Sequence, residues 1–100
     1  MSTAKTLLEL TNYAFTVKFK GTDGQYHKPA SVEYKIIDSG SGTVVLNWTA
    51  LPIIDFETTV AIPASMNVCL SDRSTEERVV IIKALNFAQG IHIYNIERCR

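Results

Sequence analysis

Residues 32–49, VEYKIIDSGSGTVVLNWT, decide the fold of this chain. In residues 32–36 apolar side chains alternate with charged ones, and this period of two is typical of a β-strand with one dry face. Residues 38–42 favour a tight turn, because glycine and small polar side chains tolerate turn conformations. The run at residues 44–49 alternates again and contains Trp48. The stretch therefore predicts a β-hairpin.

The same period of two recurs along most of the chain. Glycine, proline and aspartate residues separate the alternating runs at intervals of roughly 8–12 residues, the spacing of a β-sandwich. We therefore predict an all-β fold, an antiparallel two-sheet β-sandwich of six or seven strands. Residues 64–75 are mixed and indicate a helical turn or short strand near residues 66–70. The other strands are predicted over residues 13–20, 56–62, 78–85 and 90–98.

Trp48 is predicted to be the plug of the hydrophobic core. In a regular strand Val44, Leu46 and Trp48 fall on one face, opposite Val45 and the polar side chains of the same run. An indole buried between two sheets would make its loss cost roughly 3–5 kcal/mol.

The chain has 100 residues, of which 46% are hydrophobic and 20% charged. This length fits a single domain that can bury about two-thirds of its unfolded surface. Ten Lys and Arg residues balance ten Asp and Glu residues, so composition gives no reason to expect binding to nucleic acid or to a membrane. We see no secretory signal or membrane-spanning run, and we expect a soluble protein made in a cytoplasm.

Residues 1–12 are predicted to form an N-terminal arm, separate from a sandwich over residues 13–100. Thr6 and Glu9 have the spacing of a capping box, which favours a helical turn. The arm is too short to be a stable helix alone. It is either a fraying end or a segment that docks on another subunit through Leu7, Leu8 and Leu10.

The sequence offers no recognisable reaction centre. His27 and His92 have no Cys, His or carboxylate at a metal-ligand spacing. Nucleophile motifs and phosphate-binding loops are not found either. Three aspartates near strand ends are interpreted as turn residues, namely Asp23, Asp38 and Asp55. We predict a protein that is not an enzyme and has no catalytic residue, cofactor or metal site.

Two further groups of polar residues are given structural interpretations. Asp72, Arg73 and residues 76–78 mix both charges and predict a solvated loop, with interface salt bridges as the alternative. Cys69 and Cys99 are expected to be reduced thiols, although the sequence leaves open whether they form a disulfide.

The last two predicted strands carry more apolar surface than a sandwich needs. Residues 79–82 (VVII) present apolar side chains to both faces, and the run from Ile91 to Ile96 does the same. Either covering loops or the N-terminal leucines bury this excess, or a partner does, since a large exposed apolar patch marks an interaction site. The interface candidates are Leu7, Leu8, Leu10, Ile91 and Ile93.

Five short motifs carry a resemblance to a known family. They are residues 32–38 (VEYKIID), 41–44 (SGTV), 47–49 (NWT), 59–65 (TVAIPAS) and 76–80 (EERVV). In this order, the chain from Tyr13 to Ile96 resembles the small Ig-like or fibronectin-III-like β-sandwich proteins that are structural components of tailed bacteriophage particles.

The resemblance implies a non-enzymatic virion protein, made in the host cytoplasm, that is a capsid decoration or cement subunit or a neck or tail component. Its partners would be other virion proteins, with a homo-oligomer as a further option, and neither nucleic acid nor a membrane. The competing hypothesis is a binding module whose loops hold a carbohydrate or a host-surface ligand. Its candidate stacking residues are Tyr26, His27 and Trp48.

Overall fold

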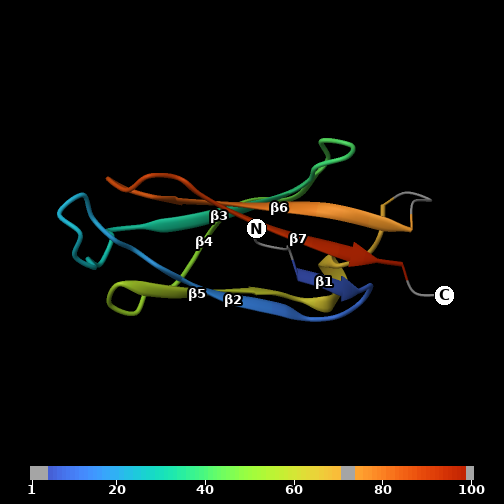
Figure 1. Cartoon of the computed structure of the whole chain (residues 1–100), viewed down its shortest axis with the longest axis horizontal. Helices are drawn as coiled ribbons and strands as arrows, with labels where there is room; N and C mark the ends of the chain where they lie inside the picture. The colour runs from blue at the N-terminus through green and yellow to red at the C-terminus, as the bar shows by residue number, and fades with distance from the viewer. Residues whose placement is uncertain (1–4, 71–73, 99–100) are drawn as a thin grey trace.

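The computed structural model describes residues 5–70 and 74–98. These residues form seven β-strands and one 3-10 turn, η1 (Figure 1). The described chain is thus all-β, as predicted. The elements are β1 (Lys5–Leu8), β2 (Tyr13–Lys18), β3 (Val32–Asp38), β4 (Val44–Ala50), β5 (Glu57–Ile62), η1 (Ala64–Met66), β6 (Thr75–Ala84) and β7 (Gly90–Glu97).

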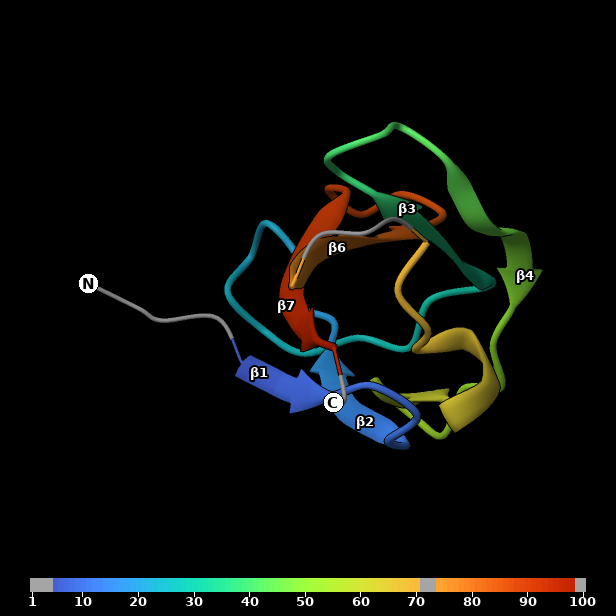
Figure 2. The ribbon, with the colours of Figure 1, turned by 90° about the vertical axis from the view of Figure 1, so that its right-hand side faces the viewer.

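The strands form two sheets that lie on either side of the core (Figure 1 and Figure 2). The larger sheet has five strands in the order β1-β7-β6-β3-β4, and the smaller sheet pairs β2 with β5. Neighbouring strands run antiparallel except β1 and β7, which are parallel. This arrangement agrees with the predicted two-sheet sandwich.

The β3–β4 hairpin turns where the DSGSG motif predicts it. Gly42 has a φ of 74°, a left-handed conformation that glycine adopts without steric cost. Asp38 Oδ2 accepts hydrogen bonds from the backbone N–H of Ser41 at 3.1 Å and from its hydroxyl at 2.6 Å. The prediction of a hairpin at this position is confirmed.

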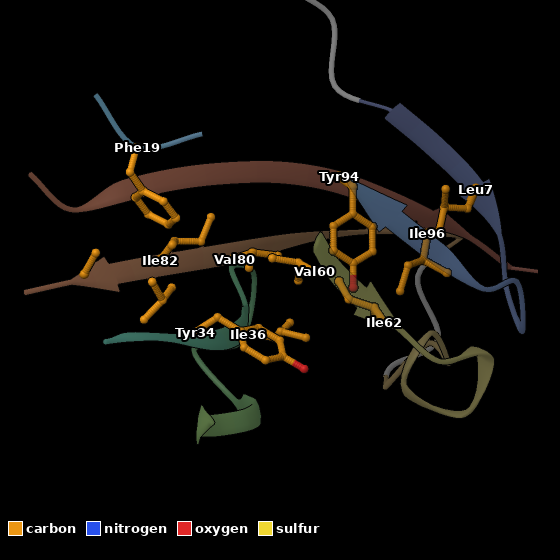
Figure 3. Close-up of a cluster of buried hydrophobic side chains, with 12 residues drawn as sticks. Leu7, Phe19, Tyr34, Ile36, Val60, Ile62, Val80, Ile82, Tyr94 and Ile96 are labelled. Atoms are coloured by element: carbon orange, nitrogen blue, oxygen red, sulfur yellow. The ribbon is translucent and has the colours of Figure 1, made fainter. Parts of the chain in front are cut away.

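The core lies between the two sheets and is built from the inward-facing side chains of alternating positions (Figure 3). Along β3 and β6 buried residues alternate with less buried ones, as the period of two predicts. The buried apolar residues are Leu7, Phe19, Val32, Tyr34, Ile36, Val60, Ile62, Val80, Ile82, Ala84, Tyr94 and Ile96.

The helical turn predicted in the N-terminal arm is wrong, because residues 5–8 form strand β1 of the larger sheet. Leu7 pairs with Ile96 in parallel register, and its side chain is buried in the core. Pairing with β7 satisfies the backbone of β1, so tertiary contacts outweigh the local capping preference of Thr6 and Glu9. Strand β1 is therefore an edge strand of the sandwich rather than a separate arm.

The prediction of Trp48 as the core plug is also wrong, because its ring lies outside the buried cluster, on the outer face of the larger sheet. Val44 pairs with the outward-facing Ile37, so Val44 and Trp48, which are four residues apart, both lie on the outer face. Two irregularities in the β3–β4 register lie between them, and each adds one residue to β4 and reverses the face of the side chains that follow. The two reversals cancel at Trp48 and turn Leu46, which pairs with Ile36, to the core instead.

Candidate functional site: the outer face of the larger sheet

The outer face of the five-stranded sheet carries two neighbouring rows of apolar side chains. Strand register places the first row across four strands, from Val44 through Ile37 and Val79 to Ile93. The second row, two residues along the strands, contains Trp48, Ile81 and Ile91, with Lys35 of β3 between Trp48 and Ile81. We call the seven apolar residues the apolar stripe.

The apolar stripe is open to solvent in this chain. Ile91 is 66% exposed, Val44 46% and Ile93 39%, while the remaining members are half-buried. A sheet that faced only water on this side would carry polar side chains here. The apolar excess predicted for the last two strands is therefore real, and none of the described loops covers it at these three residues.

A group of charged residues, which we call the lysine end, consists of Glu33 and Lys83 at one border of the stripe and of Lys35 within its second row. Lys83 Nζ lies 3.2 Å from Glu33 Oε1. The Nζ atoms of Lys83 and Lys35 lie 5.0 Å and 5.7 Å from the centroid of the Trp48 ring, which is a cation–π arrangement. The aliphatic chains of the two lysines shield the indole, so Trp48 is half-buried without entering the core.

The opposite side of the stripe is acidic, and we call it the glutamate end. Glu77 is the outward residue of β6 that precedes Val79, and Glu97 lies on the outward side of β7. The Ser39 hydroxyl donates a hydrogen bond to Glu77 Oε1 at 2.9 Å. The two borders of the stripe therefore differ in the sign of their charge.

The structure places the five interface candidates in different parts of the fold. Ile91 and Ile93 belong to the apolar stripe. Leu8 is exposed at the end of β1, on the edge of the sheet, and Leu10 is exposed in the β1–β2 connection with a φ of 64°. Leu7 is buried in the core of its own domain, so the prediction that it docks on another subunit is wrong.

A buried ionic cluster at one end of the sandwich contradicts the predicted solvated loop. Arg78 and Glu76 lie on the inner face of β6, and both are fully buried together with Asp38 of β3. Arg78 Nη2 donates to Glu76 Oε1 at 3.0 Å, and Arg78 Nε lies 3.5 Å from Asp38 Oδ1. The guanidinium also donates to the carbonyl oxygens of Met66 (3.1 Å) and Val68 (2.7 Å).

The ionic cluster fastens the connection between β5 and β6 to the larger sheet. Both carboxylate oxygens of Glu76 accept the backbone N–H of Leu70 at 2.9 Å. The sequence does carry a signal for this burial. Glu76, Arg78 and Val80 alternate along β6 with a period of two, so the two charged residues lie on the same inward face as Val80. The remaining residues of the predicted loop, Asp72 and Arg73, lie outside the described residues.

Asn67 links this connection to the segment that joins β1 and β2. Its Oδ1 accepts a hydrogen bond from the Tyr94 hydroxyl at 2.8 Å, and its Nδ2 donates to the carbonyl of Thr11 at 2.7 Å. The backbone N–H of Leu10 donates to the carbonyl of Asn67 at 2.7 Å. Burial raises the pKa of Tyr94 to about 12, which keeps its phenol protonated as a donor.

An aromatic cluster connects the two sheets between β2 and β7. The Phe15 ring stacks on the His92 imidazole with centroids 3.8 Å apart and an interplanar angle of 15°. The Tyr13 hydroxyl oxygen lies 2.6 Å from His92 Nε2. Desolvation by this apolar neighbourhood lowers the pKa of His92 from its ordinary value.

The lowered pKa of His92 predicts that the domain loses stability as the pH falls below about 6.5, the ordinary histidine pKa. The unfolded chain takes up a proton there that folded His92 resists, whereas at higher pH the residue is neutral in both states. In His92→Phe, urea unfolding between about pH 7 and pH 5 should therefore show a smaller loss of stability. Ile54→Ala is the control, because Ile54 is 79% exposed in the connection to β5 and its replacement should retain the wild-type pH dependence. An unchanged profile in His92→Phe would contradict the prediction.

The three residues of the carbohydrate hypothesis do not share one platform. Tyr26 stacks on Phe56 with ring centroids 4.9 Å apart, whereas Trp48 lies on the outer face of the larger sheet. His27 Nε2 lies 2.8 Å from Asp23 Oδ2 and takes part in its own exposed turn. The geometry therefore gives no stacking site formed by Tyr26 and Trp48 together.

Neither the described structure nor comparison with known proteins assigns a chemistry to this chain. Residues 5–70 and 74–98 contain no group of three His, Cys, Asp or Glu side chains that could hold a metal ion. They also form no helix with the length and apolarity needed to cross a membrane. Cys69 is a free thiol, and Cys99 lies outside the described residues. No protein-family model, curated protein or solved structure matches the chain.

Proposed function

We propose that this chain is a non-enzymatic structural protein of a tailed bacteriophage virion, which acts through protein–protein contacts as a capsid decoration or cement subunit or as a neck or tail component. The apolar stripe carries the proposal, because Val44, Ile91 and Ile93 remain exposed on a face that a solitary sheet would cover with polar residues. The virion class rests on the resemblance of the VEYKIID, SGTV, NWT, TVAIPAS and EERVV motifs.

In this proposal the sandwich is of the Ig-like or fibronectin-III-like class. The strand order β7-β6-β3-β4 corresponds to strands G, F, C and C′ of the Ig sandwich, and the pair β2–β5 corresponds to strands B and E. The correspondence supports the class by topology, which agrees with the resemblance of the sequence motifs.

A structural role on a particle suits a surface of this kind. A virion presents many copies of each attachment site, so contacts that are weak singly add up when they are repeated. Ten basic residues balance ten acidic ones, so long-range attraction contributes little. Specificity then depends on the shape and charge pattern around the apolar stripe.

The proposal predicts that virions of a phage encoding this chain contain it in stoichiometric copies. Ile91→Lys should reduce its copy number per particle by about tenfold or more, because burying an unpaired ammonium in the stripe is strongly unfavourable. Copy number is measured as the amount of the chain relative to the major capsid protein in purified particles.

Ile54→Lys is the matched control, because Ile54 is 79% exposed and lies in the connection to β5, away from the stripe. It should be incorporated normally. Wild-type particles that lack the chain, or normal incorporation of Ile91→Lys, would overturn the proposal.

A further inference from the structure

We propose that the occupant of the apolar stripe is a second copy of this chain, packed face to face. The twofold axis of this dimer runs across the strands, midway between the two apolar rows. The inference rests on the proposed function, in which the stripe is a docking surface, and it names the partner at that surface.

The central strand β6 carries a self-complementary pattern. Its outward side chains follow in the order Glu77, Val79, Ile81 and Lys83. A twofold axis across the strands lays one β6 antiparallel over the other, so each residue meets its counterpart in reverse order. Val79 then packs on Ile81 of the other copy, and Lys83 faces Glu77 of the other copy.

Strand β7 extends this match on one side of β6. On β7 the same axis places Ile91 over Ile93 of the other copy, so two exposed members of the stripe cover each other. Lys83 and Glu33 come to lie over the end that carries Glu77, while Lys35 lies over Ile37 of the other copy. Complementary charge at the border of an apolar contact favours association and fixes its orientation.

The charge pattern selects this axis over the alternative. A twofold axis parallel to the strands and centred on β6 would place Lys83 over Lys83 of the other copy and Glu77 over Glu77. Like charges facing each other across an interface are unfavourable. The axis across the strands instead brings the apolar residues of β6 and β7 together and places Lys83 opposite Glu77.

The dimensions of the stripe also fit a second sheet. Four strands at a spacing of about 4.8 Å give a stripe about 15 Å long, and two sheets pack face to face about 10 Å apart. A second copy presents a stripe of the same length with the same two rows. It therefore covers each exposed isoleucine with apolar surface.

Sedimentation equilibrium of the purified full-length chain tests the dimer. The wild type should show a reversible monomer–dimer equilibrium, and Ile91→Lys should raise the dissociation constant by about tenfold or more. Ile54→Lys should leave it unchanged. A chain that stays monomeric at millimolar concentration, or a dimer that is insensitive to Ile91→Lys, would overturn the inference.

A charge exchange on β6 tests the orientation. Lys83→Glu and Glu77→Lys should each raise the dissociation constant by about fivefold, because each places like charges opposite one another in both halves of the dimer. The double variant should return to within about twofold of the wild type. The proposed axis would be contradicted if Lys83→Glu lowered the dissociation constant. It would also be contradicted if the dissociation constant of the double variant showed both single increases combined.

The outcomes for the dimer and for the proposed function are distinguishable. A monomeric chain that is nevertheless incorporated into particles through Ile91 would refute the dimer and leave the structural role standing. A dimeric chain that is absent from particles would refute the structural role and leave the dimer standing.

Discussion

Replacing Arg78 with methionine is expected to destabilise the domain by about 3–5 kcal/mol, the cost of breaking a buried ion pair from one side. Arg78 is fully buried and approaches two carboxylates, Glu76 at 3.0 Å and Asp38 at 3.5 Å. Methionine is similarly long but brings neither charge nor donors. Both carboxylates lose this cation, and the carbonyls of Met66 and Val68 lose their guanidinium donor.

Urea unfolding followed by circular dichroism measures this loss. The control is Lys83→Met, which breaks the exposed pair with Glu33 and should cost about 1 kcal/mol or less. Adding Glu76→Gln to Arg78→Met should recover part of the stability, because one buried charge is then removed. Equal costs for Arg78→Met and Lys83→Met would show that the buried cluster adds nothing beyond a surface pair.

Tyr94→Ala is expected to destabilise the domain by about 3–5 kcal/mol, because it empties a large part of the core. Tyr94 is fully buried, and its ring lies 4.9 Å from that of Tyr13 between the two sheets. Its hydroxyl also donates to Asn67, so the substitution removes a buried hydrogen bond together with the ring. Tyr94→Phe removes only the hydroxyl and should cost about 1–3 kcal/mol.

Trp48→Ala is the matched control for Tyr94→Ala. It also deletes a large aromatic ring, but from the half-buried outer face, so its cost should be clearly smaller. Unfolding is followed by circular dichroism, because Trp48 is the only tryptophan and its fluorescence disappears with it. A larger cost for Trp48→Ala than for Tyr94→Ala would contradict the arrangement of the core.

The parts of the fold that depend on local alternation could be predicted from the sequence. The DSGSG turn and its flanking runs gave the β3–β4 hairpin, and the last two strands lie close to their expected bounds. The apolar excess on the outer face was also visible, since Ile91 and Ile93 alternate out of phase with the buried residues of β7. These features need only the two-residue period and the turn chemistry of nearby residues.

The parts that depend on distant pairing could not be predicted in this way. The face of Trp48 follows from the pairing of Val44 with the outward-facing Ile37, the bulges that turn Leu46 inward form only where β4 meets β3, and the strand state of residues 5–8 requires β7. The burial of Arg78 and Glu76 requires Asp38 and the connection before β6, which supply their partners. A charged motif looks solvated until the groups that compensate its burial are known.

The pairing of β1 with β7 has a consequence for how the domain is made. It joins the first strand described to the last, so the larger sheet cannot close before β7 has been synthesised. Until then Leu7 lacks Ile96, its partner in β7. We expect a slow final folding step that follows the synthesis of β7, as is typical of topologies rich in contacts between distant residues.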